Sequence, residues 1–170
     1  ATGAGTDELR GGIAALLAGL PPRADVGRPR LPIDRVFTMA GFGTVVTGTL
    51  IAGTLREGDD LVVLPDARRA RVRGIEVFGR ATPVALPGQR TAVNLQGVEA
   101  ASIERGDLLT APGVLEPSHL IDVSIEVLAG AAAPLKDLAR VRLHHGTVEA
   151  MARVRLVGVP AAPPGGRAFA

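Results

Sequence analysis

The fold is constrained most by residues 31–50, which read LPIDRVFTMAGFGTVVTGTL. β-Branched and apolar residues dominate 33–39 and 44–50, and the glycine-containing segment 40–43 between them supplies the backbone freedom of a turn. This stretch therefore predicts two neighbouring strands of one sheet.

Two adjacent charged residues, Asp34 and Arg35, interrupt the first of these apolar runs. Because side chains alternate between the faces of a strand, we expect the two to point to opposite faces. At least one should then lie where water or a ligand can reach it. Taken alone, the pair also fits ordinary surface residues, since exposed charge pairs are common and contribute little to stability.

Short apolar runs alternate with turn signals from residue 31 to about residue 117, which is typical of an antiparallel barrel or sandwich. Further strands are expected at 61–64, 71–78 and 90–95 and near 108–109. Closure of these strands into a barrel would leave no open sheet edge.

A second β unit is expected over residues 118–170. Apolar and polar residues alternate in strict period two over 121–127, and further strands are predicted at 141–144 and 148–157. Three strands make a poor closed barrel, so we expect this second domain to be truncated.

The N-terminal residues predict a helix over 6–20, with Thr6 as its N-cap. Gly11 and Gly12 weaken such a helix, so it needs another surface to pack against. We expect residues 1–22 to end a preceding domain and residues 23–30, rich in proline and arginine, to be a linker. The apolar residues on one face of the helix are Leu9, Ile13, Leu16, Leu17 and Leu20.

The composition argues against several classes of site. Without cysteine, and with only His119, His144 and His145, a structural zinc site is not expected. No apolar run approaches the roughly 18 residues of a membrane span, and the first residues lack the basic and apolar segments of a signal peptide, so we expect a cytoplasmic protein without membrane partners. The 19 basic residues, against 17 acidic ones, can contact phosphate, but with four phenylalanines and no tryptophan or tyrosine a base-stacking platform is not expected.

Five segments resemble, in this order, domain 2 of translational GTPases of the elongation factor Tu superfamily. They read LPIDRVFTMAGFGTVVTGTL, LREGDDLVVLP, RVRGIEVFG, PGQRTAVNLQGV and IERGDLL. Within the superfamily, LPIDRVF, GFGTVVTGT, GQR and the later HHGT are most similar to the selenocysteine-specific elongation factors, the SelB type. The general factor has two acidic residues where this chain has Asp34 and Arg35, arginine at the position of Phe42, and asparagine at that of Arg90.

This resemblance implies a mainly β fold. Residues 1–22 would be the C-terminal helix of a GTPase domain, residues 31–117 an elongation factor Tu-like antiparallel barrel, and residues 118–170 part of a second barrel. It also implies a monomer that delivers selenocysteinyl-tRNA to the ribosome at recoded UGA codons, with mRNA hairpin contacts made by C-terminal domains outside this chain.

Enzymatic activity is not expected of this segment itself. The sequence has no Walker A pattern, and its single lysine is Lys136, so GTP and Mg²⁺ would bind the GTPase domain of a longer parent protein. No cofactor, metal or catalytic residue is therefore expected here.

The resemblance assigns Asp34, Arg35 and Arg90 to the pocket for the selenocysteinyl end of the tRNA. A selenol is more acidic than a thiol, and two arginines can donate N–H groups to the resulting selenolate. The Asp34 carboxylate can orient a guanidinium or meet the aminoacyl ammonium. A neutral seryl group would leave the cations unpaired, which for buried charges costs roughly 3–5 kcal/mol.

Other residues and readings remain open. Phe78 stands where we expect histidine in similar family stretches, which affects the fine detail of the pocket. A second translational reading is a factor that carries ordinary or initiator tRNA, but a pocket for neutral side chains gains nothing from two cations. A third is a β-barrel adaptor that binds protein. Candidates for tRNA backbone contact, which fit a solvated sheet face equally well, are Arg140, Arg142, His144, Arg153 and Arg155.

Overall fold

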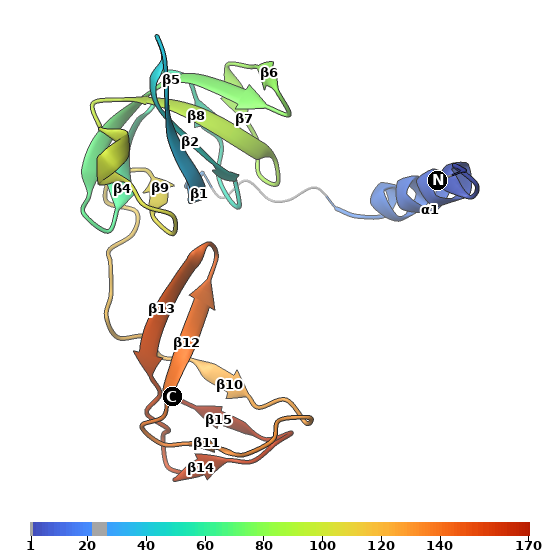
Figure 1. Ribbon diagram of the computed structural model, residues 1–170, viewed down its shortest axis with the longest axis vertical. Coiled ribbons are helices and arrows are strands. Elements are labelled where there is room, and N and C mark those ends of the chain that lie inside the picture. The colour runs from blue at the N-terminus through green and yellow to red at the C-terminus, as the bar shows by residue number, and fades with distance from the viewer. Residues whose placement is uncertain (1, 22–26) are drawn as a thin grey trace.

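The computed structural model describes residues 2–21 and 27–170, which form two β units and one helix (Figure 1). Part of the predicted linker, residues 23–26, lies outside the described residues. Its last residue, Arg30, already belongs to the first strand. The prediction of a mainly β chain with one helix is confirmed.

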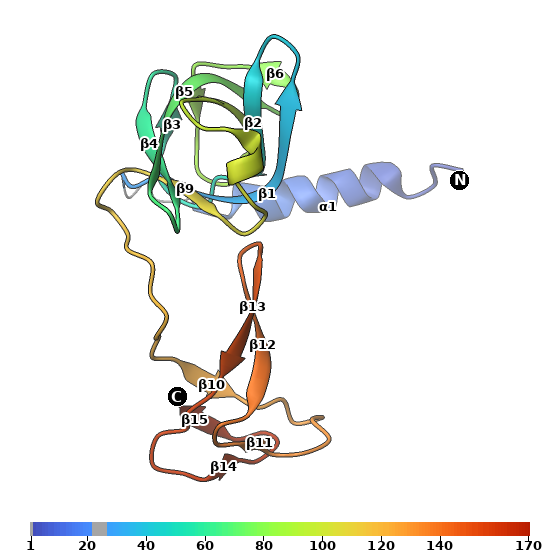
Figure 2. The ribbon, with the colours of Figure 1, turned by 60° about the vertical axis from the view of Figure 1, so that its left-hand side comes forward.

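Six antiparallel strands close the first barrel in the order β4-β9-β1-β2-β8-β5, with β5 pairing back to β4 (Figure 2). All six lie close to the predicted positions, and their closure confirms the predicted antiparallel barrel. They are β1 (Arg30–Met39), β2 (Gly43–Thr49), β4 (Asp60–Leu64), β5 (Arg68–Val77), β8 (Arg90–Gln96) and β9 (Leu108–Thr110).

Three short strands and one 3-10 turn of the first unit are not evident from the sequence pattern. β3 pairs with β7, and β6 extends the sheet beyond β5. Each of these strands has two residues, too few for a periodic pattern to emerge. They are β3 (Leu55–Arg56), β6 (Arg80–Ala81) and β7 (Val84–Ala85), with η1 at Ala100–Ser102.

Branched aliphatic side chains fill the interior of the first barrel. Leu31 and Ile33 of β1, Val46 of β2, Val93 of β8 and Leu109 of β9 are fully buried. Burial of each such side chain contributes about 1.5–3 kcal/mol of transfer free energy. Since neighbouring residues alternate along a strand, the same strands present polar side chains on the outer wall.

The second unit consists of three antiparallel pairs, β10–β15, β11–β14 and β12–β13. A separate small cluster of buried residues, including Val127, Val154 and Leu156, holds these pairs together. Their bounds are β10 (Ser124–Glu126), β11 (Leu135–Lys136), β12 (Arg140–His145), β13 (Val148–Arg153), β14 (Ala161–Ala162) and β15 (Arg167–Phe169).

The strand predicted over 121–127 is shorter than its pattern indicates. Strand β10 pairs with β15 only over Ser124–Glu126, although Val123 also exchanges backbone hydrogen bonds with Ala170, and Ile121 remains 53% exposed. Strand β13 likewise ends at Arg153 rather than at residue 157. Period two therefore identified these strands but not their lengths.

The helix α1 (Thr6–Ala18) begins differently from the prediction. Gly5, with φ of 79°, occupies the N-cap position, and Thr6 is the first helical residue, whose hydroxyl donates to the Gly3 carbonyl at 2.6 Å. Leu20 lies beyond the helix. No residue of α1 is buried, so its apolar face is open among the described residues. Over the same residues, no helix has both the length and the apolar character needed to cross a membrane.

Candidate functional site

The outer wall of the first barrel carries a β-bulge at Asp34. In the β1–β2 ladder, Ile33 pairs with Gly48 and Arg35 pairs with Thr47, so Asp34 is an extra residue without an opposite partner. Ile33 and Val36 both pack in the core although they are three residues apart. Asp34 and Arg35 therefore both lie on the outer wall, and the expectation that they point to opposite faces is wrong.

Asp34 connects three neighbouring strands through its carboxylate. Thr47 of β2 donates its hydroxyl to Asp34 Oδ1 at 2.8 Å. Arg90 of β8 donates Nη2 to the same oxygen at 2.9 Å and Nη1 to Oδ2, a bidentate ion pair. The structure thus brings together Asp34 and Arg90, which are 56 positions apart in the sequence.

The ionisation of Asp34 reflects these contacts. Partial burial acts to raise the pKa of Asp34. The hydrogen bonds from Arg90 and Thr47, together with the charges of Arg90 and Arg35, outweigh burial and hold this pKa below its usual value. The hydrogen bond to Asp34 in turn raises the pKa of Arg90. Asp34 is therefore an anion held between two permanent cations.

Arg35 lies beside this pair and is itself exposed. Within residues 2–21 and 27–170 its side chain makes no hydrogen bond, and its charge acts on Asp34 through space. The site consequently has one carboxylate and two guanidiniums, a net charge of +1. The Arg90 side chain is 44% exposed and that of Asp34 20%, so a ligand could reach both.

Thr47 is the site residue that sequence reasoning missed. Its signal is the hairpin register: Met39 pairs with Gly43, and counting back along both strands from this turn brings Thr47 beside the charged pair. The place of Thr47 beside the charged pair can be predicted from the position of the turn. That its hydroxyl donates to Asp34 cannot, because this contact depends on the bulge.

Arginines also gather on the β12–β13 hairpin. Arg140 and Arg153 are directly opposite each other across the two strands. Arg142 forms an ion pair with Glu149 at 3.2 Å, and His144 Nδ1 lies 3.9 Å from the same carboxylate. Glu149 thus partly neutralises this end of the face. Arg155 is exposed just after β13, so the predicted residues share the hairpin and the segment that follows it.

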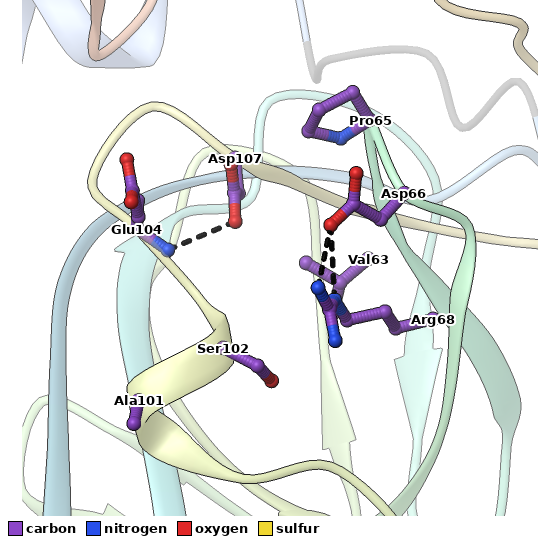
Figure 3. Close-up of a pocket in the computed structure, with 8 residues that line it drawn as sticks. All are labelled: Val63, Pro65, Asp66, Arg68, Ala101, Ser102, Glu104 and Asp107. Atoms are coloured by element: carbon purple, nitrogen blue, oxygen red, sulfur yellow. Dashed lines mark hydrogen bonds and ion pairs between the residues drawn. The ribbon is translucent and has the colours of Figure 1, made fainter.

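A cavity of about 320 Å³ lies elsewhere on the first barrel, between the β4–β5 turn and the segment leading to β9 (Figure 3). Asp66 within it pairs with Arg68 at 2.7 Å, and Asp107 accepts a hydrogen bond from the Glu104 amide at 2.9 Å. These polar groups satisfy one another. None of the predicted site residues lines the cavity.

Comparison with known proteins agrees with this architecture. Residues 43–110 match the family described as elongation factor Tu domain 2. The selenocysteine-specific elongation factor of Desulfomicrobium baculatum is 48% identical over 153 residues, covering 90% of this chain and 24% of that protein. That of Haemophilus influenzae is 34% identical over 158 residues, covering 92% of this chain and 24% of that protein.

A solved structure extends the similarity to the fold of the whole chain. The crystal structure of a bacterial selenocysteine-specific elongation factor matches with a TM-score of 0.80 and 27% identity, over 99% of this chain and 27% of that one. This chain spans about a quarter of the length of these relatives. By sequence and by fold, it belongs with the selenocysteine-specific elongation factors of the elongation factor Tu superfamily.

Proposed function

We propose that this chain is the tRNA-binding part of a translation elongation factor that delivers selenocysteinyl-tRNA to the ribosome at recoded UGA codons. The proposal is carried by the bulge that sets Asp34 and Arg35 on the same wall as Arg90. In the full-length protein, GTP and Mg²⁺ would be bound by a GTPase domain, and mRNA contacts would be made by further C-terminal domains.

The charge of the site suits an anionic side chain. Asp34 uses only part of the donor capacity of Arg90, since a guanidinium has five N–H groups and the ion pair engages two of its nitrogens. Arg35 and the remaining donors of Arg90 can then approach a selenolate. Asp34 balances one of the two cations and can accept from the aminoacyl ammonium.

The exposure of the site sets the size of the expected preference. Because the Arg90 side chain is 44% exposed and already paired, a neutral ligand does not leave a fully buried cation behind. Hydrogen bonds to charged groups contribute about 1.5–3 kcal/mol. This range, smaller than that expected for buried charges, corresponds to a roughly tenfold to hundredfold preference for the selenolate over the seryl hydroxyl.

The test measures binding of selenocysteinyl-tRNA and seryl-tRNA by the full-length, GTP-bound protein. We expect Arg35→Ala and Arg90→Ala each to lower the ratio of the two affinities by about tenfold, since each removes one cation near the anion. Arg68→Ala is the matched control, because Arg68 has a similar exposure of 45% and also pairs with an aspartate, Asp66. An unchanged ratio in both site variants would refute the proposed pocket.

The basic hairpin face is the second part of this proposal. Arg140 and Arg153 lie together without an acidic partner among the described residues, as phosphate-contacting side chains would. We propose that Arg140, Arg142, His144, Arg153 and Arg155 contact the backbone of the same tRNA.

A further inference from the structure

The tip of the β12–β13 hairpin reaches the first barrel in both views (Figures 1 and 2). Thr147, in the turn between the two strands, donates its hydroxyl to the Ile33 carbonyl of β1 at 2.7 Å. Its own carbonyl accepts from Arg105 Nε at 3.5 Å. The second unit therefore contacts the strand that carries the candidate site, at the residue just before Asp34.

Ile33 is held by several partners from outside the β1–β2 ladder. Its carbonyl accepts from the Gly106 amide at 2.9 Å as well as from Thr147, and its amide donates to the Asp107 carbonyl at 2.8 Å. These contacts continue the pairing of β1 toward β9 and hold the backbone of Ile33 at the residue where the β1–β2 ladder is interrupted by the bulge.

The hairpin tip is also packed closely against the barrel. A Cβ atom added to Gly106 would lie 3.0 Å from the Cα of Val148, and Gly106 has φ of +105°. A Cβ atom on Gly146 would lie 3.5 Å from the Pro32 ring. Backbone of the turn therefore lies directly on the loop before β9 and on β1, leaving little freedom for Thr147.

We propose that Thr147 is a positioning residue for the candidate aminoacyl site: its hydroxyl fixes the Ile33 carbonyl and so holds the bulge that presents Asp34 to Arg90. The relevance to tRNA rests on the proposed function, whereas the positioning itself does not. It follows that the second unit contributes to the geometry of a site built on the first barrel.

The test compares Thr147→Val, which removes the donor while keeping the branched shape, with Thr147→Ser, which keeps the donor. NMR titration of the Asp34 carboxyl in this chain is the readout. We expect Thr147→Val to raise the pKa of Asp34 toward its usual value, because a loosened bulge weakens the contacts from Arg90 and Thr47. Thr147→Ser should titrate as the wild type does.

Thr38→Val is the matched control, because Thr38 is an exposed residue of β1 with no side-chain hydrogen bond to the described residues. Should Thr147→Val fail to fold, Val148→Ala loosens the same tip and should raise the pKa of Asp34 by a smaller amount. An Asp34 titration unchanged in the folded tip variant would overturn the inference.

The two proposals can fail separately. If Thr147→Val moves the Asp34 titration while Arg35→Ala and Arg90→Ala both leave the tRNA preference unchanged, the positioning role stands and the proposed pocket fails. If Arg90→Ala abolishes the preference while Thr147→Val leaves the Asp34 titration unmoved, the proposed function stands and the positioning role is refuted.

Discussion

Replacing Gly48 of β2 by alanine is predicted to destabilise the first barrel, because atoms of β1 already occupy the space that an alanine Cβ would need. A Cβ atom at Gly48 would overlap the Pro32 carbonyl oxygen and lie 2.8 Å from Leu31 Cδ2. Favourable carbon–carbon contacts lie at about 3.5–4.0 Å, so β1 would have to shift by about 1 Å. The clash is with backbone as well as with a fully buried side chain, and neither can rotate away.

Overpacking of this kind destabilises a domain by about 1–3 kcal/mol, and the backbone clash places Gly48→Ala near the upper end, at about 3 kcal/mol. For a domain of this size, 1 kcal/mol shifts Tm by about 4–8 °C, so we expect the first barrel to melt roughly 12–24 °C lower. Thermal unfolding followed by circular dichroism, with urea unfolding at 25 °C, would measure the change.

Gly74→Ala provides the matched control within the same barrel. Gly74 has no positive φ, and the nearest atom to an added Cβ is Glu57 Oε1 at 3.9 Å, an ordinary contact. This substitution should change the unfolding free energy by less than about 0.5 kcal/mol. A Gly48→Ala protein that melts within a few degrees of Gly74→Ala would refute the packing argument.

Two further predictions concern charge. The folded-state pKa of Asp34 lies below its unfolded value of about 3.9, so the ionised carboxylate stabilises the fold above that value, and this stabilisation is lost as pH falls through the folded-state pKa. The difference in unfolding free energy between wild type and Asp34→Asn should therefore stay constant from about pH 7 to pH 5 and shrink below about pH 4; a difference unchanged at about pH 3 would contradict this. In the full-length protein, Arg153→Ala should reduce the slope of log K for tRNA against log salt by about 0.7–0.9, and Arg142→Ala by less, because Glu149 already neutralises Arg142. A wild-type slope in Arg153→Ala would argue against a phosphate contact by Arg153.

Sequence patterns predicted the first barrel well because its strands are long and alternate regularly. The strands β1, β2, β4, β5, β8 and β9 lie close to where apolar runs and turn signals placed them. The two-residue strands were not predicted, because the pairing of β3 with β7 and of β11 with β14 depends on tertiary contacts rather than on a local sequence pattern. The helix was predicted with its apolar face, but Gly5 rather than Thr6 lies at its N-cap position.

The candidate site was less accessible to the same reasoning. Nothing local links Asp34 to Arg90, which come from strands β1 and β8 with β2 between them. Only the family resemblance assigned the two residues to one pocket, and the structure shows that they form an ion pair. Thr147 is further removed still, because its contact with Ile33 joins two separately packed units across 114 positions.

The wrong assignment of Asp34 and Arg35 to opposite faces has a specific cause, and the sequence carries a trace of it. Alternation predicts faces only while the ladder is continuous, and an inserted residue reverses it from that point onward. In β1, the inward-facing residues Leu31 and Ile33 are two positions apart, whereas the next, Val36, is three positions further. A single break of this kind in the period-two pattern is the sequence signature of a β-bulge. It lies at the two charged residues, so the irregularity that hides the site from a simple pattern is also what puts both charges on one wall.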